Sequence, residues 1–341
     1  MIKIISEELV EQAKALIEEA QRITLVSHIS PDGDAVGSIL GMHHLLRALG
    51  KETKMVLPNY FPDSFNWMPD SDKILIHEAD SKAVKTAFDE ADLVICIDFN
   101  SRKRINGVRP FLDQTKAKTL LIDHHIGPEE FATVTISYPD ASSACMLVYS
   151  LIAQMGWHDK MTKACAECIY VGMMTDTGNF SYASQDPDIY IIISELLALG
   201  IDKDEIYRRV NNNYSESRMR MMGYCLLNKM KIYPEQHTAV ISLTQSELQQ
   251  FNHKVGDTEG FVNIPLSIAG ITRSIFVRKE DKKVKLSFRS QGNVPVNTIA
   301  QEHFNGGGHM NAAGGESYLS LEDTLKKLKK VILSIDNARF D

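Results

Sequence analysis

The sequence has little cysteine and no long apolar run, and these two deficits exclude whole classes of protein. Its 341 residues contain five cysteines, an odd number set in apolar surroundings, which excludes a complete disulfide framework and predicts buried free thiols at Cys96, Cys145, Cys165, Cys168 and Cys225. Two of them form a CxxC pair, but no second pair accompanies it, so we expect core residues of a helix, not metal ligands.

The sequence also lacks an apolar stretch of about 18 residues, the length that crosses a membrane as a helix. Residues 1–20 read as an acidic amphipathic helix and not as a signal peptide. We therefore expect a cytoplasmic protein that does not bind a membrane.

Positive charge is in deficit too, because the formal net charge is −7. This balance argues against a protein that coats long nucleic acids by counterion release, but it leaves room for a short anionic ligand at a metal site. Basic residues gather between 273 and 289, which is typical of a solvated face and equally of a phosphate-binding surface.

Apolar, β-branched runs alternate with helical stretches in the first half of the chain. This alternation predicts a parallel sheet covered on both faces, with strands over 23–27, 55–59, 92–98, 119–125 and 133–137. Residues 142–232 are mostly helical, ending in a long helix over 216–230. A second set of elements follows, with strands over 237–243, 261–270, 271–279 and 283–290 and helices over 296–304 and 321–335.

We therefore predict an α/β protein of two domains, as its length also suggests. Residues 1–190 form an N-terminal domain with a parallel sheet and flanking helices. Residues 191–230 form a helical linker, and residues 231–341 form a smaller C-terminal α/β domain.

Polar side chains follow several of the predicted strands. The segment SHISPDGDAV places His28, Asp32 and Asp34 between a strand and a helix, and ICID ends in Asp98. LLIDHH contributes Asp123, His124 and His125, and Asp176 ends a helical run just before Gly178. A lone aspartate at such a place usually caps a helix. Carboxyl ends of parallel strands, however, meet at one edge of a sheet, so four such segments are expected to converge.

Several buried carboxylates are tolerated together only if cations neutralise them, so convergence implies a metal. The mixture of carboxylates and imidazoles favours Mn²⁺ or a similar first-row ion over an all-oxygen Ca²⁺ or Mg²⁺ site.

These motifs resemble a known family. In order, HISPDGDA, VICIDFN, LIDHH and TDTGNF are similar to the motifs of the DHH phosphoesterase superfamily. FNGGGHMNAAGG resembles the GGGH signature of the DHH-associated domain, and SFRS resembles the strand that supplies its substrate arginine. The resemblance covers nearly the whole chain and is strongest to the nanoRNase and pAp-phosphatase branch, often called NrnA-like.

The resemblance implies a site with two Mn²⁺, with Mg²⁺ or another divalent ion as alternatives. His28, Asp32 and Asp98 would hold one ion, and Asp34, Asp98, His124 and Asp176 the other. His125 would reach the substrate phosphate, and Asp123 would orient a histidine. The implied substrate-binding residues are Arg289, Gly306, Gly307, Gly308 and His309, with Arg273 as a weaker candidate.

The implied activity is hydrolysis of short single-stranded RNA to mononucleotides and dephosphorylation of 3′-phosphoadenosine 5′-phosphate (pAp) by a metal-bridging hydroxide. The glycine-rich turn would bind a remote phosphate and so measure substrate length. Two alternatives stay open: a phosphodiesterase for linear or cyclic dinucleotides (pApA, c-di-AMP), and a catalytically silent nucleotide-binding module. The resemblance also leaves room for a homodimer.

Overall fold

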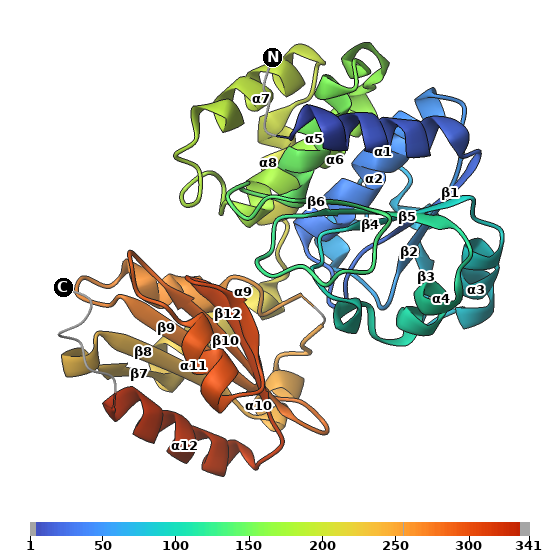
Figure 1. The fold of residues 1–341 in the computed structure, drawn as a ribbon. Coiled ribbons are helices and arrows are strands. Elements are labelled where there is room, and N and C mark those ends of the chain that lie inside the picture. The colour runs from blue at the N-terminus through green and yellow to red at the C-terminus, as the bar shows by residue number, and fades with distance from the viewer. Residues whose placement is uncertain (1–4, 255, 335–341) are drawn as a thin grey trace. The chain divides into compact units, whose positions relative to one another are not determined.

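The computed structural model describes residues 5–254 and 256–334 (Figure 1). The described chain divides into two compact units, the first ending at Asn213 and the second beginning at Tyr214. This division falls inside the 191–230 segment. Residues 1–4 of the first predicted helix and residue 335 of the last lie outside the described residues.

The first unit is built on a six-stranded sheet in the order β3-β2-β1-β4-β5-β6, in which every neighbouring pair is parallel. Its strands are β1 (Arg22–Val26), β2 (Glu52–Leu57), β3 (Leu75–Ile76), β4 (Leu93–Ile97), β5 (Lys118–Asp123) and β6 (Val134–Ser137). The predicted parallel sheet is confirmed, except that the two-residue β3 was not predicted. The strand order reverses between β1 and β4, and there the carboxyl ends of parallel strands leave a crevice open to ligands.

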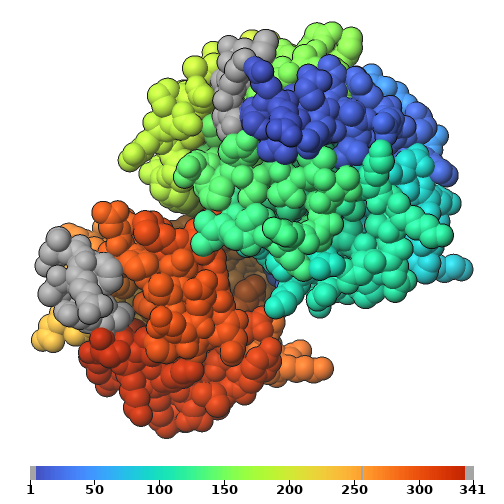
Figure 2. Space-filling model, viewed as in Figure 1, coloured from blue at the N-terminus to red at the C-terminus, as the bar shows by residue number. Residues whose placement is uncertain are grey.

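Helices cover both faces of this sheet, as predicted (Figure 1). One face packs against α1 (Glu7–Glu19), α2 (Gly33–Ala48), α5 (Ala144–Gln154) and α6 (Lys163–Asp176). The other packs against α3 (Ser81–Asp89) and α4 (Arg109–Gln114), which follows the 3₁₀ segment η3 (Arg102–Val108). The unit ends with α7 (Pro187–Ala198) and α8 (Lys203–Asn211), and α1 lies on its outer surface (Figure 2).

The positions of the cysteines and the lengths of the helices follow from these elements. All five cysteines are buried free thiols, as predicted, and Cys165 and Cys168 lie in the packed interior of α6. Among the described residues, no helix is both long enough and apolar enough to span a membrane.

The second unit has a mixed six-stranded sheet in the order β11-β12-β10-β9-β8-β7, with only the β8–β9 pair parallel. Its strands are β7 (Met230–Tyr233), β8 (Thr238–Leu243), β9 (Arg273–Lys279), β10 (Val284–Ser290), β11 (Gly307–His309) and β12 (Ala312–Ser317). The described helices are α9 (Glu216–Tyr224), α10 (Gln245–Gln250), α11 (Asn297–His303) and α12 (Leu321–Leu333), and α12 lies on the outside of this unit (Figure 2).

Our prediction of a strand over 261–270 is wrong. The segment forms the 3₁₀ helix η7 (Phe261–Ser267), which contains Pro265, a residue without the N–H that a central strand needs. Phe261 and Val262 are nevertheless buried against Phe276 in the core. A short apolar run therefore identified a buried segment but not its secondary structure.

Candidate metal centre

Three neighbouring strands deliver polar residues to one edge of the first sheet. His28 follows β1, Asp98 follows β4 directly, and Asp123 ends β5. Asp98 adopts a left-handed backbone conformation with φ of +67°, while its N–H still donates to the carbonyl of Ile122 at 2.9 Å. Aspartate tolerates this region better than most residues, and such local strain is concentrated at functional sites.

The imidazoles of His28 and His124 are oriented by backbone carbonyls. His28 Nδ1 donates to the carbonyl of Ile29 at 2.8 Å, and its Nε2 lies 3.2 Å from Asp98 Oδ2. His124 Nδ1 donates to the carbonyl of Ala141 at 3.1 Å. Because a carbonyl only accepts, Nδ1 carries the proton in each neutral ring, and Nε2 has the lone pair that a metal needs.

His124 Nε2 faces three carboxylates at once. It lies 3.4 Å from Asp176 Oδ2, 3.5 Å from Asp98 Oδ1 and 3.8 Å from Asp34 Oδ2. Asp176 ends α6 and Asp34 lies in the first turn of α2, so the ends of two helices and two strands meet here. The sequence predicted this convergence, and the structure brings these side chains together.

Asp34 is buried in the first turn of α2 and is fixed by α5. Its carboxylate accepts hydrogen bonds from the N–H groups of Ala144 at 2.6 Å and Cys145 at 2.9 Å. Gly172 on α6 leaves room for it, since a Cβ there would lie 2.7 Å from Asp34 Oδ1. The carboxylate is therefore held in one position by packing and hydrogen bonds together.

Asp32 is the N-cap of α2, and half of its side chain is exposed. Its Oδ1 accepts from the N–H groups of Asp34 and Ala35 and lies 4.0 Å from His28 Nε2. The capping role that we weighed as an alternative for such aspartates is thus present here, within reach of the cluster.

Burial and mutual charge shift the pKa values of these groups strongly. Burial, together with the charges of Asp98 and Asp176, raises the pKa of Asp34 well above its ordinary value. Burial also acts to raise the pKa of Asp98, but hydrogen bonds from His124 and His28 outweigh it and hold this pKa well below its usual range. Burial acts to lower the pKa of His124, and the hydrogen bond to Asp98 and the charge of Asp176 raise it well above normal instead.

The cluster therefore attracts positive charge, and its donor atoms suit divalent cations. The ligand atoms of His28, Asp32 and Asp98 lie within 4.8 Å of one another, as do those of Asp34, His124 and Asp176. Imidazole nitrogens with carboxylate oxygens match the preferences of first-row metal ions. The residues present thus fit two metal sites, with Asp98 beside both.

A second layer of the cluster runs through His125. Asp123 is fully buried, and its Oδ1 accepts a hydrogen bond from His125 Nδ1 at 2.8 Å. On the other side of the ring, Arg104 Nη1 donates to His125 Nε2 at 2.7 Å. We did not predict Arg104. The sequence Arg102-Lys103-Arg104 offers three basic residues after the β4 aspartate and no pattern that selects one.

In the second unit, Arg289 and His309 lie on the same face of the sheet. Arg289 on β10 and His309 on β11 both stand in register with Ala312 on β12, the strand between them. Residues in register across antiparallel strands project to the same face. Both side chains are half-buried, so they lie near enough to the surface to meet a ligand.

We expected the three glycines before His309 to form a turn. Instead, Gly307 and Gly308 belong to strand β11. A Cβ at Gly306 would lie 2.0 Å from the carbonyl oxygen of Gly314. Gly308 has φ of +137°, and a Cβ there would lie 2.5 Å from the carbonyl oxygen of Ala312. These two glycines are therefore needed for strand packing, whereas a Cβ at Gly307 would make only ordinary contacts with Gln301.

Arg273, the weaker candidate, is buried on β9. Its Nη1 donates to the carbonyl of Gln236 at 2.9 Å, and burial lowers its pKa. This contact gives Arg273 a structural role within its own unit.

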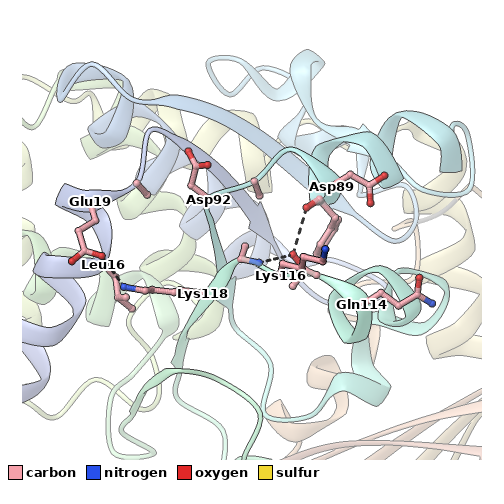
Figure 3. A pocket seen from close by; sticks show the side chains of 12 residues that line it. Leu16, Glu19, Asp89, Asp92, Gln114, Lys116 and Lys118 are labelled. Carbon is pink, nitrogen blue, oxygen red and sulfur yellow. Dashed lines mark hydrogen bonds and ion pairs between the residues drawn. The ribbon is translucent and has the colours of Figure 1, made fainter.

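A pocket of about 720 Å³ lies at the opposite edge of the first sheet (Figure 3). Glu19 at the end of α1 lines it, with Asp92 just before β4 and Lys118 at the start of β5. Lys118 pairs with Glu19 at 2.7 Å. Because the strands are parallel, their amino ends border this pocket, and the metal-binding cluster lies at their carboxyl ends.

The chain was compared with known protein families and with individual proteins. Residues 22–173 match the model of the DHH family, N-terminal domain, and residues 238–334 match the DHHA1 domain. The bifunctional oligoribonuclease and PAP phosphatase NrnA of Thermus thermophilus is 30% identical over 292 residues, covering 86% of this chain and 83% of that protein. The Bacillus subtilis protein of the same name is 27% identical over 302 residues, covering 87% of this chain and 89% of that protein.

Two solved structures illustrate the similarity. A Bacteroides fragilis protein described as exopolyphosphatase-related is 46% identical, with a TM-score of 0.93 and coverage of 97% of both chains. The exonuclease RecJ bound to manganese has a TM-score of 0.53 at 15% identity, covering 98% of this chain and 97% of that one, which is a likeness of fold alone.

Proposed function

Because the chain belongs to the DHH family of metal-dependent phosphoesterases, we propose that it hydrolyses short oligoribonucleotides to mononucleotides and dephosphorylates pAp. The observation that carries this proposal is the match, over most of its length, to relatives named for both activities. Small anionic substrates of this kind also suit a chain with a net charge of −7, since few phosphates need contacts. We place the reaction in the cytoplasm, where five free thiols stay reduced.

We assign His28, Asp32 and Asp98 to one Mn²⁺ and Asp34, Asp98, His124 and Asp176 to the other. When bound, two such ions would lower the pKa of a bound water and would neutralise charge on the phosphoryl oxygens. The protein holds the ligand atoms in place through the carbonyls of Ile29 and Ala141 and the N–H groups at the start of α5.

The remaining site residues bind the substrate or orient the residues that bind it. Asp123 fixes the ring of His125. His125 Nδ1 lies 3.7 Å from Asp98 Oδ1, so the ring borders the place of the scissile phosphate. In the second unit, Arg289 and His309 offer directed donors to a remote phosphate of the substrate. Contact with that second phosphate would favour substrates of a few nucleotides.

Two other substrate classes compete with this assignment. The same metal centre would cleave linear or cyclic dinucleotides such as pApA and c-di-AMP. Inorganic polyphosphate is the second, because the protein described as exopolyphosphatase-related is 46% identical to this chain.

The test is a ranking of kcat/KM with the Mn²⁺-loaded protein. The panel contains 5′-labelled RNAs from two to about twenty nucleotides, pAp, pApA, c-di-AMP and polyphosphate. We expect the shortest RNAs to rank first, with measurable release of phosphate from pAp. A preference for the dinucleotides or for polyphosphate, with neither pAp nor three- to five-nucleotide RNAs turned over, would contradict the proposal. Nucleotide binding with no turnover of any substrate would favour a silent binding module.

A further inference from the structure

Arg104 is a cation held at the edge of the metal-binding cluster, and none of the sequence motifs accounts for it. We propose that Arg104 is a phosphate-binding residue of this centre and that it contacts the phosphoryl group directly. The proposal rests on the proposed function, because it concerns the same site and the same class of substrate.

The backbone of Arg104 is anchored to the cluster. Its carbonyl accepts a hydrogen bond from the N–H of Ile29, the residue after His28, at 2.8 Å. The start of η3 is tied to the segment after His125, since Glu129 accepts from the backbone N–H of Arg102 at 2.9 Å and from its guanidinium. These contacts join η3 to the loops that carry His28 and His125, so Arg104 is held in position before any ligand arrives.

The side chain of Arg104 is hydrogen-bonded to an imidazole and not to a carboxylate. Its Nη1 donates to His125 Nε2, and His125 Nδ1 donates to the carboxylate of Asp123. Within the described part of the chain, Arg104 forms no ion pair with a carboxylate, unlike Arg102, which pairs with Asp113 and Glu129. A guanidinium has five N–H donors, so a half-buried arginine bound to an imidazole keeps donors and a full charge for an anion.

The hydrogen bonds also limit what His125 can do. A carboxylate only accepts and a guanidinium only donates, so this arrangement puts the ring proton on Nδ1 and makes Nε2 an acceptor. An acceptor cannot donate to a phosphate oxygen. In this arrangement the donors to the phosphate therefore come from Arg104, and His125 acts as the residue that orients it.

The charge balance of the centre also supports a phosphate contact by Arg104. The centre gathers five carboxylates, those of Asp32, Asp34, Asp98, Asp123 and Asp176. Two divalent cations leave one net negative charge among them, which would repel a phosphate. Arg104 cancels it, and its planar fork matches two phosphate oxygens.

The test measures binding without turnover. AMP is titrated into the Mn²⁺-loaded protein by calorimetry, with bound metal quantified in the same samples. Arg104→Gln should weaken AMP binding about 10- to 100-fold, the loss expected for hydrogen bonds to a charged group. Arg104→Lys should recover part of the affinity. Lys103→Gln, which removes the neighbouring exposed cation on η3, should bind AMP as the wild type does.

A second comparison separates direct contact from action through His125. In a His125→Ala background, Arg104→Gln should still weaken AMP binding, because the arginine itself meets the phosphate. No further loss in that background, or unchanged AMP affinity in Arg104→Gln, would overturn the proposal, and so would a loss that tracks bound metal. Failure of the wild type to hydrolyse RNA or pAp would instead contradict the proposed function and leave this binding test readable.

Discussion

The two units present their candidate functional residues in different ways. In the first, the groups lie at the ends of parallel strands and are buried: the side chains of Asp34, Asp98 and His124 are at most 6% exposed. In the second, Arg289 and His309 stand half-buried on the face of a mixed sheet. Burial in the first unit creates strong fields that only cations relieve, whereas the half-buried donors of the second unit stay closer to solvent. We therefore expect changes in the first unit to affect kcat and changes in the second to affect KM.

The largest effect should follow from Asp98→Asn. Asparagine tolerates the left-handed backbone of this residue, so the change removes the shared negative charge and little else. We expect kcat for pAp to fall about 1,000-fold or more, because metal ions contribute several kcal/mol to such reactions. Bound metal should fall as well.

Asp70→Asn is the matched control for this variant. Asp70 is also left-handed, with φ of +64°, and it pairs with His43 and Lys73 in the same unit. The activity of the Asp70→Asn protein should match that of the wild type. An Asp98→Asn protein that kept both ions and most of its rate would rule out a shared ligand at this position.

The second-largest effect concerns pH. We expect the stability of the metal-free protein to change with pH differently from that of the metal-loaded protein. The pKa of His124 is raised in the metal-free fold. A raised folded-state pKa stabilises the fold at pH values below the unfolded pKa, about 6.5 for histidine, and that stabilisation is lost as the pH rises through the folded pKa. Metal binding needs the same ring deprotonated, so it strengthens over that range.

The difference in Tm between Mn²⁺-loaded and metal-free protein should therefore widen as the pH rises above about 6.5. Differential scanning calorimetry over this range measures it, with the Asp98→Asn protein as a control that should show a smaller difference. A Tm difference that stayed constant or narrowed with rising pH would show that protons and metals do not compete for this cluster.

In the second unit, Arg289→Ala and His309→Ala should raise KM for short RNA about 10-fold while changing kcat little, as expected for a charge-assisted hydrogen bond to a remote phosphate. Lys282→Ala, an exposed residue of the same basic stretch, is the matched control and should leave KM unchanged. Equal KM values in all three variants would remove Arg289 and His309 from the substrate site.

The smallest effects are expected from alanine substitutions of the glycines before His309. These substitutions distinguish a role in strand packing from a role in substrate binding. Gly306→Ala should destabilise the second unit, because its Cβ would collide with the backbone of Gly314. Gly307→Ala meets only ordinary contacts and should keep the wild-type Tm. If the backbone at Gly307 approaches a phosphate, this variant raises KM at unchanged stability. An unchanged KM would leave the glycines with a packing role alone.

Much of the first unit could be predicted from local pattern. Short β-branched runs such as 92–98 identify buried parallel strands because both faces are apolar. His28, Asp98 and Asp123, at the ends of three of these strands, mark the carboxyl edge. The same reasoning failed at 261–270, where burial without periodicity did not distinguish a 3₁₀ helix from a strand. It also missed β12, whose AAGGES sequence has weak strand propensity and is held by its pairing with β10.

The sequence by itself determined which groups gather in the metal centre, because strand ends and chemistry-bearing residues are encoded next to each other in the chain. Only the tertiary structure decided the contacts between segments. It selected Arg104 from three adjacent basic residues by placing it against His125. It also showed that two of the three glycines before His309 serve strand packing. These choices depend on distances between residues far apart in the chain, and no local pattern records them.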